Sequence, residues 1–116
     1  MNKDFILKNT RSYEEDLLED LKDPAEAQSY LEASLEAYEE DSDTAALLLA
    51  LQHVAKAQGG IGKLAKQTGI NREHLYEMLA GKHNPRLDNL LAILSSLGFR
   101  IRLERASAPR VPAATS

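Results

Sequence analysis

Residues 61–81 read IGKLAKQTGINREHLYEMLAG, and this stretch decides the fold. Its pattern predicts two short helices, joined by the tight turn Gly69-Ile70-Asn71. Glycine suits the start of such a turn because it adopts left-handed backbone angles without a steric penalty. Asn71 is a good N-cap for the second helix, and Ala65 is small enough to let the two helices cross closely. This spacing is typical of a helix-turn-helix.

The flanking sequence predicts further helices around this pair. Ser12 with Glu15 forms a capping box, and Asp23 followed by Pro24 is a second start signal. A third helix begins at Asp43 or Thr44, where an apolar stretch follows. The expected helices cover residues 12–21, 24–40, 44–58, 62–68, 72–80 and 87–97. In the last of them we expect a stripe of leucines to point inward: Leu87, Leu90, Leu91, Leu94 and Leu97.

Composition supports a helical chain. Of 116 residues, 19 are Leu and 16 are Ala, whereas Ile and Val together number only 7. Leucine and alanine favour helix, and few β-branched residues disfavour an extensive sheet. The predicted fold class is therefore all-α: a compact helix-turn-helix domain with extra N-terminal helices and one short C-terminal β-strand.

That strand is expected at residues 99–104, where apolar and charged residues alternate. A single strand cannot satisfy its own backbone groups, so it needs a partner. One candidate is Met1–Leu7 of the same chain. The preferred candidate is the same strand of a second copy, which makes the chain a homodimer. The dimerisation residues would be Phe99, Ile101 and Leu103.

Charge divides the chain into two unlike halves. The formal net charge is −4. Residues 1–57 hold 5 basic and 14 acidic side chains, whereas residues 58–116 hold 9 basic and 4 acidic ones. Such a split suggests two different partners. We expect an acidic N-terminal arm with helices over residues 1–42, a helix-turn-helix domain with its strand over 43–105, and a flexible tail over 106–116.

Several classes of function are disfavoured. Cysteine is absent, which excludes disulfides, thiolate metal sites and cysteine nucleophiles. The longest apolar run, Ala45–Leu51, is far too short for a membrane span, and the N-terminus lacks signal-peptide features. The three histidines lack metal-ligand spacing. We expect a cytoplasmic protein that is not an enzyme, with no metal, no cofactor and no small-molecule substrate.

The outward face of the helix at residues 72–80 is a candidate for reading the major groove of double-stranded DNA. Arg72 could bond guanine and Asn71 adenine, while Glu73 or Glu77 could accept from cytosine. Basic residues at both ends of the motif could bind phosphates. The candidate DNA-binding residues are Lys63, Lys66, Asn71, Arg72, Glu73, His74, Tyr76, Glu77, Lys82 and Arg86. The alternative is a helical bundle in which Glu73 and Glu77 belong to an ordinary solvated face.

The run Leu49–Leu103 resembles the HigA-like, XRE-type antitoxins of addiction modules. The most telling parts are GKHNPRLDNLLAIL at residues 81–94 and LGFRIRL at 97–103, and the resemblance extends over roughly residues 11–104. It implies a small, lambda-repressor-like dimer that represses its own operon and neutralises a RelE/HigB-like ribonuclease toxin encoded beside it. The alternatives are a helix-turn-helix module for protein interaction and a stand-alone regulator without a toxin partner.

A toxin of this kind must be basic to hold RNA, so the acidic N-terminal segment is its candidate binding site. Apolar side chains on the first helix could anchor the contact. The candidate toxin-binding residues are Tyr13, Glu14, Leu17, Leu18, Asp20 and Leu21. The alternative is that these acidic residues form only the solvated face of packing helices.

Overall fold

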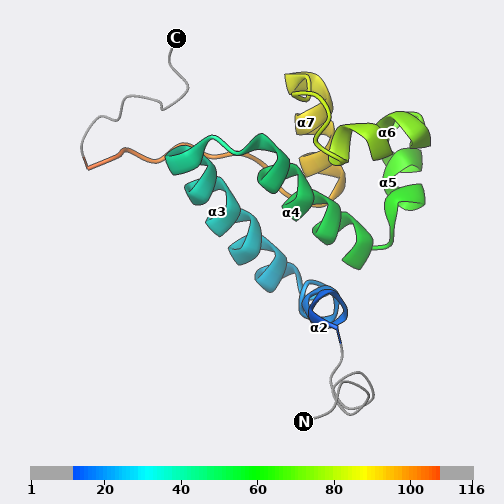
Figure 1. The fold of residues 1–116 in the computed structure, drawn as a ribbon, viewed down its shortest axis with the longest axis horizontal. Coiled ribbons are helices and arrows are strands. Elements are labelled where there is room, and N and C mark those ends of the chain that lie inside the picture. The colour runs from blue at the N-terminus through cyan, green and yellow to red at the C-terminus, as the bar shows by residue number, and fades with distance from the viewer. Residues whose placement is uncertain (1–11, 108–116) are drawn as a thin grey trace, which may run out of the picture.

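A computed structural model describes residues 12–107 of the chain, and every regular element in this range is a helix (Figure 1). The predicted all-α class is therefore confirmed for the described residues. The elements in order are α2 (Tyr13–Asp20), α3 (Pro24–Asp41), α4 (Thr44–Ala57), α5 (Ile61–Thr68), α6 (Arg72–Leu79) and α7 (Leu87–Ser96).

The predicted helix starts are confirmed, and local capping explains them. The Ser12 hydroxyl accepts a hydrogen bond from the Glu15 amide at 3.1 Å. Asp23 accepts from the Ala25 amide at 3.0 Å and Asp43 from the Ala46 amide at 3.1 Å. Each cap satisfies a backbone N–H that the first helical turn leaves unpaired.

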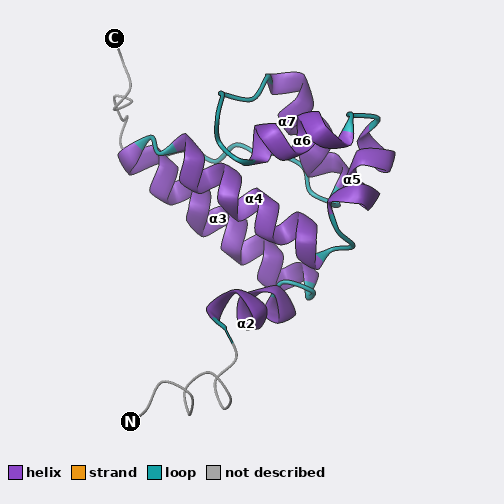
Figure 2. Ribbon diagram, turned by 45° about the vertical axis from the view of Figure 1, so that its right-hand side comes forward, coloured by secondary structure: helices purple, strands orange, loops and turns teal. Residues whose placement is uncertain are grey.

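Helices α3 and α4 form a hairpin, and α2 lies across the end of the hairpin where α4 finishes (Figure 2). The Gln58 side chain fixes this end by donating to the carbonyl oxygens of Leu21, at 2.7 Å, and Lys22, at 3.2 Å. On the other side of α4, α5, α6 and α7 complete the fold. The boundaries predicted at residues 42/43 and 105/106 stay predictions.

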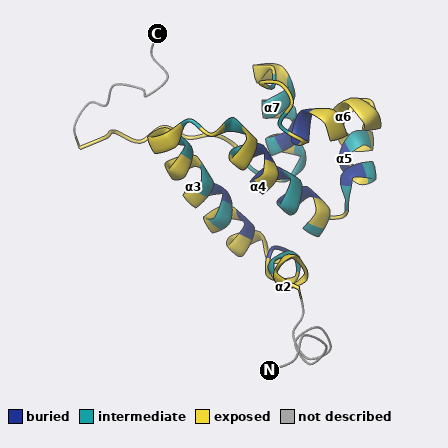
Figure 3. Cartoon of the chain, viewed as in Figure 1, coloured by how far each residue is buried: buried dark blue, intermediate teal, exposed yellow. Residues whose placement is uncertain are grey.

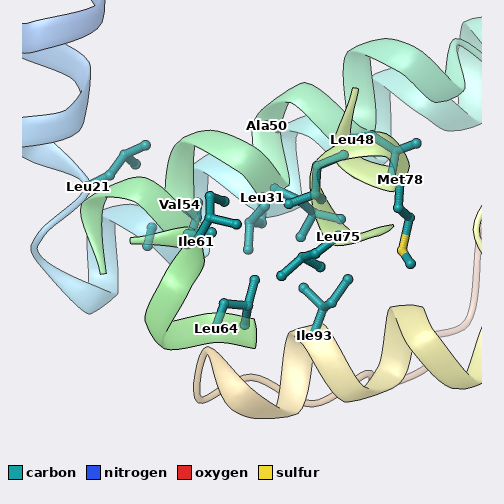
Figure 4. Close-up of a cluster of buried hydrophobic side chains, with 14 residues drawn as sticks. Leu21, Leu31, Leu48, Ala50, Val54, Ile61, Leu64, Leu75, Met78 and Ile93 are labelled. Carbon is teal, nitrogen blue, oxygen red and sulfur yellow. The ribbon is translucent and has the colours of Figure 1, made fainter. Parts of the chain in front are cut away.

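One cluster of buried apolar side chains connects these elements (Figure 4). Leu64 of α5, Leu75 of α6 and Ile93 of α7 point toward a common centre, and none of the three is more than 2% exposed. No polar or charged residue in the described range is buried. Since burial of apolar surface is the main favourable term in folding, this cluster holds α5 and α6 in position.

The inward stripe predicted for α7 is partly wrong. Leu87 is 68% exposed and Leu91 is 41% exposed, whereas Ile93 is completely buried. At about 100° per residue, Ile93, Leu97, Leu90 and Leu94 lie next to one another around the helix, with Leu87 and Leu91 to one side. The buried face of α7 is therefore centred nearer Ile93 than the five leucines predict.

The prediction of a C-terminal strand is also wrong for this structure, because residues 99–104 form no strand. Phe99 is half-buried and its amide donates to the Leu94 carbonyl at 2.9 Å, but residues 100–107 are exposed. No other described segment supplies the neighbouring backbone that a strand needs. The intrachain candidate, Met1–Leu7, lies outside the described residues, as do residues 8–11 of the predicted N-terminal region and residues 108–116 of the predicted tail.

Between residues 12 and 107, none of the helices combines the length and the apolar character that crossing a membrane requires.

Candidate nucleic-acid interface

The turn between α5 and α6 has the backbone that the sequence predicts. Gly69 has a φ of +76°, in the left-handed region, and its amide donates to the Ala65 carbonyl. The Thr68 hydroxyl donates to the Leu64 carbonyl at 2.8 Å and accepts from the Ile70 amide at 3.2 Å. These bonds end α5 and start the turn, and they fix the angle at which α6 leaves it.

Asn71 is the N-cap of α6. Its Oδ1 accepts from the Glu73 amide at 2.9 Å and from the His74 amide at 3.3 Å. Bidentate reading of adenine needs both the oxygen and the nitrogen of an asparagine amide. Because the oxygen already serves as the cap, this geometry favours a structural role for Asn71 over direct base reading.

The two faces of α6 differ sharply in exposure (Figure 3). Leu75, Met78 and Leu79 are buried against the rest of the core. The residues predicted to face DNA are all exposed: Arg72, Glu73, His74, Tyr76 and Glu77. The outer face of this helix is therefore free to enter a groove of suitable width.

Arg72 is held between α5 and α6. Its Cζ lies 5.8 Å from the centre of the Tyr76 ring, within range of a cation–π contact. On the other side, a Cβ added to Gly62 would lie 3.9 Å from the Arg72 guanidinium. Together with Lys63, Lys66 and Ala65, these residues line a shallow hollow beside the turn. Three cationic side chains thus converge where α5 and α6 meet.

The remaining predicted contacts are more dispersed. Lys82 is exposed in the loop before α7. Arg86 forms two bonds to Asp88, Nε to Oδ1 at 3.2 Å and Nη2 to Oδ2 at 3.3 Å, so its charge is already paired. Glu73 and Glu77 make no ion pair within residues 12–107. The face is therefore mixed in charge, with its positive part concentrated around Arg72.

The predicted toxin-binding residues of α2 do not share one environment. Tyr13 is 81% exposed and Asp20 is exposed, whereas Leu17 and Leu18 are half-buried. The Glu14 carboxylate lies 3.3 Å from Lys56 Nζ of α4, and Leu21 is only 2% exposed within the core. Leu21 thus helps to attach α2, and a partner could reach only the outer residues.

Negative charge dominates this end of the molecule. Residues 12–57 hold 13 acidic side chains and only two basic ones, Lys22 and Lys56. Both lysines are paired with neighbouring carboxylates, Lys22 with Glu19 at 2.8 Å and Lys56 with Glu14 at 3.3 Å. The surface over α2 and α3 therefore keeps a large excess of negative charge.

His53 of α4 is half-buried and is hydrogen-bonded to Tyr30 of α3. The Tyr30 hydroxyl lies 2.9 Å from His53 Nδ1. Burial lowers the pKa of His53, with nearby Lys56 acting in the same direction and Glu14 against it. Burial also raises the pKa of the Tyr30 hydroxyl. The sequence offered no signal for this contact, which depends on how α3 and α4 pack.

The predicted dimerisation residues border a groove. This groove, of about 520 Å³, is lined mainly by residues of α3 and by the segment 99–104. Phe99 is half-buried, whereas Ile101 is 54% exposed and Leu103 is 97% exposed. Leu35, on the α3 wall, is itself 46% exposed. An apolar strip in contact with water thus runs beside the segment.

Comparison with known proteins gives a family match over nearly all described residues. The model of a family described as probable addiction module antidote protein matches residues 12–105. An uncharacterised protein of Haemophilus influenzae is 30% identical over 91 residues, which cover 78% of this chain and 89% of that protein. No solved structure gives a significant match.

Proposed function

The chain belongs to the family of probable addiction module antidote proteins, and from this premise we propose that it is the antitoxin of a type II toxin–antitoxin module. In this proposal it is a HigA-like, XRE-type homodimer without catalytic activity. It binds and neutralises a basic RelE/HigB-like ribonuclease and represses its own operon. The observation that carries the proposal is the family match over residues 12–105, which includes both the acidic helices and the α5–α6 pair.

DNA binding is assigned to the α5–turn–α6 unit, acting as a helix-turn-helix. The support is the exposed outer face of α6 and the convergence of Lys63, Lys66 and Arg72 beside it. Arg72 is the candidate for a bidentate contact with guanine, and the lysines are candidates for phosphate contacts. Glu73 and Glu77 would repel phosphates, so they favour sites that offer a cytosine amino group.

Gel shifts with the DNA immediately upstream of the gene test this assignment. Arg72→Ala should weaken operator binding by about tenfold or more and relax specificity at one position. Lys63→Ala should weaken binding to all sequences and reduce the salt slope by about one. Arg86→Ala is the matched control, because the Arg86 charge is already paired with Asp88 and its loss should cost less.

Absence of retardation at low salt would overturn the DNA-binding assignment. The chain would then be a protein-interaction module in which the α5–α6 unit is only part of the fold. Mixed charge on α6, from Glu73 and Glu77, is the observation that favours this second candidate.

Toxin binding is assigned to the outer surface of α2. Its support is the charge excess of residues 12–57 and the exposed aromatic ring of Tyr13. Opposite charge speeds association with a basic partner, and aromatic anchors contribute much of the binding energy. Asp20→Lys should slow association, whereas Tyr13→Ala should speed dissociation.

Surface plasmon resonance with the neighbouring gene product measures both rates. Arg72→Ala, at the opposite functional face, is the control and should leave toxin binding unchanged. If neither α2 variant alters toxin binding, the acidic helices are solvated packing elements and the toxin site lies elsewhere. If no toxin-like gene lies beside this one, the remaining candidate is a stand-alone regulator.

A further inference from the structure

Residues 100–104 leave their backbone groups without partners among the described residues, and the apolar side chains of Ile101 and Leu103 are exposed. Phe99 is tied to α7, but residues 100–104 make no backbone hydrogen bond to any other described residue. Leu103 is 97% exposed, and Ile101 shares the same side of an extended chain. A row of unpaired backbone groups next to exposed apolar side chains is suited to pairing with another strand.

We propose that this segment pairs antiparallel with the same segment of a second copy, with the two-fold axis passing through Arg102. The inference deepens the dimeric repressor proposed above, which needs two recognition helices in a fixed relation. It assigns the groove beside α3 to the partner copy and gives the register of the contact.

The register follows from charge and apolar matching. In an antiparallel ladder, residues directly opposite one another point to the same face. An axis at Arg102 puts Ile101 opposite the partner's Leu103 and Arg100 opposite the partner's Glu104. By symmetry each of these pairs occurs twice. The result is two apolar pairs on one face and two opposite-charge pairs on the other.

The neighbouring registers give less favourable cross-strand contacts. An axis at Ile101 would put Arg100 opposite the partner's Arg102, which repeats a like-charge contact twice. An axis at Leu103 would put Ile101 opposite the partner's Arg105. An axis between two residues would place apolar side chains opposite charged ones throughout. The preferred register keeps a single like-charge contact, between the two Arg102 side chains at the axis. Its one mismatch puts Arg105 opposite the partner's Phe99, at the end of the ladder where Phe99 is already bonded to Leu94 and packed against the core.

The groove offers the resulting two-stranded ribbon an apolar patch at Leu35, beside the acidic residues Glu32, Glu36 and Glu39 of α3. Leu35 of α3 lines the groove together with Ile101 and Leu103 and is 46% exposed. When Leu103 of one copy pairs with the partner's Ile101, both side chains can cover Leu35. Burial of this strip adds a hydrophobic contribution to pairing that a bare two-stranded ribbon lacks.

Disulfide trapping tests the register directly, because the natural chain has no cysteine. Opposite residues in an antiparallel ladder have Cα atoms about 4.5–5.5 Å apart, within the range of a disulfide. Full-length Arg102→Cys should therefore cross-link to twice the chain mass under mild oxidation. Ile101→Cys and Leu103→Cys should cross-link much more slowly, because each lies diagonal to its own copy. Faster trapping at either of these positions would overturn the proposed register.

Charge exchange gives a second test by sedimentation, without DNA or toxin. Arg100→Glu and Glu104→Arg should each raise the dimer Kd by about tenfold or more, since each replaces two attractive pairs by repulsive ones. The double variant should restore dimerisation, and Arg102→Gln, which removes only the like charges that face each other at the axis, should not weaken it. A natural chain that is monomeric at micromolar concentration, or a double variant that stays monomeric, would overturn the proposal.

The toxin is the competing candidate for the groove, and a different experimental result would identify it. If the chain is monomeric and added toxin protects Leu103→Cys from alkylation, the groove belongs to the toxin and the homodimer proposal falls. Toxin neutralisation in cells tests the antitoxin assignment separately. The Arg100→Glu variant should still neutralise the toxin even though its dimer is weakened.

Discussion

The Tyr30 hydroxyl lies 2.9 Å from His53 Nδ1, and this contact joins the middle of α3 to α4. It ties the acidic helix α3 to α4, and α4 is also the helix against which α5 and α6 pack. A change in the charge of His53 therefore acts at the junction between the two candidate interfaces.

We predict that acidification weakens this junction. Burial lowers the pKa of His53 in the folded chain, so the folded state favours the neutral ring relative to an unfolded pKa of about 6.5. The stabilising contribution is present above the unfolded pKa and is lost as the pH falls through the folded one. His53→Gln removes the titration but keeps a polar group near Tyr30. Thermal melts at pH 7.5 and 5.5 should show a larger fall in Tm for the natural chain than for this variant. An equal fall in both proteins would contradict the prediction.

Two glycines should respond differently to alanine. Gly69 has φ +76° with no atom within 4 Å of an added Cβ, so Gly69→Ala carries only backbone strain, about 1–2 kcal/mol. Gly81 has φ +79°, and its added Cβ would lie 3.0 Å from the Cβ and 3.1 Å from the Cα of Ala45. Gly81→Ala should therefore cost more than Gly69→Ala in urea unfolding. Gly69→Asn, which tolerates left-handed angles better, serves as the matched control.

Truncation of α7 should separate its two faces. Ile93→Ala removes a completely buried side chain and should lower the free energy of unfolding by about 2–5 kcal/mol. Leu91 is 41% exposed, so Leu91→Ala should cost less than half as much. Urea titrations of both variants measure the difference. Equal losses would mean that the exposed side of α7 is covered in solution.

Local signals made much of the fold predictable from sequence. Ser12, Asp23 and Asp43 cap the helices that they were expected to start, and Gly69 and Asn71 occupy their expected places in the turn. These features depend on a few neighbouring residues, so the sequence carries them directly. The expected helix ends differ from the observed ones by at most one residue.

What the sequence missed depends on contacts between distant segments. The inward side of α7 is set by where α5 lies, so Leu87 and Leu91 were misplaced even though the helix was expected. The bonds from Gln58 to the end of α2 and from Tyr30 to His53 join residues more than 20 positions apart. The strand at 99–104 needs a neighbouring backbone that alternation alone cannot supply.

The candidate site shows the same division. Exposure of α6 residues follows from helical periodicity, and it was predicted. The packing of Arg72 against Gly62 and Tyr76, and the pairing of Arg86 with Asp88, depend on side-chain geometry. These contacts concentrate the available positive charge near Arg72. The positions of the basic residues in the sequence do not indicate this concentration.

Two roles are open to Asn71: capping α6 and contacting a DNA base. Its Oδ1 caps α6 through bonds of 2.9 Å and 3.3 Å to the Glu73 and His74 amides. Asn71→Ala should cost about 1 kcal/mol of stability, the usual loss for an N-cap, whereas Asn71→Ser should retain most of it. If Asn71 acts through the cap, the serine variant should also bind the operator like the natural chain, because it holds α6 in the same orientation.

Urea unfolding and operator gel shifts on the same two variants provide the comparison. A serine variant that is fully stable but binds the operator tenfold more weakly would show that Asn71 contacts a base. That result would require the cap to open on DNA, because its oxygen cannot fully serve adenine and both backbone amides at once. Under the capping role, loss of stability and loss of affinity should instead occur together, and only in Asn71→Ala.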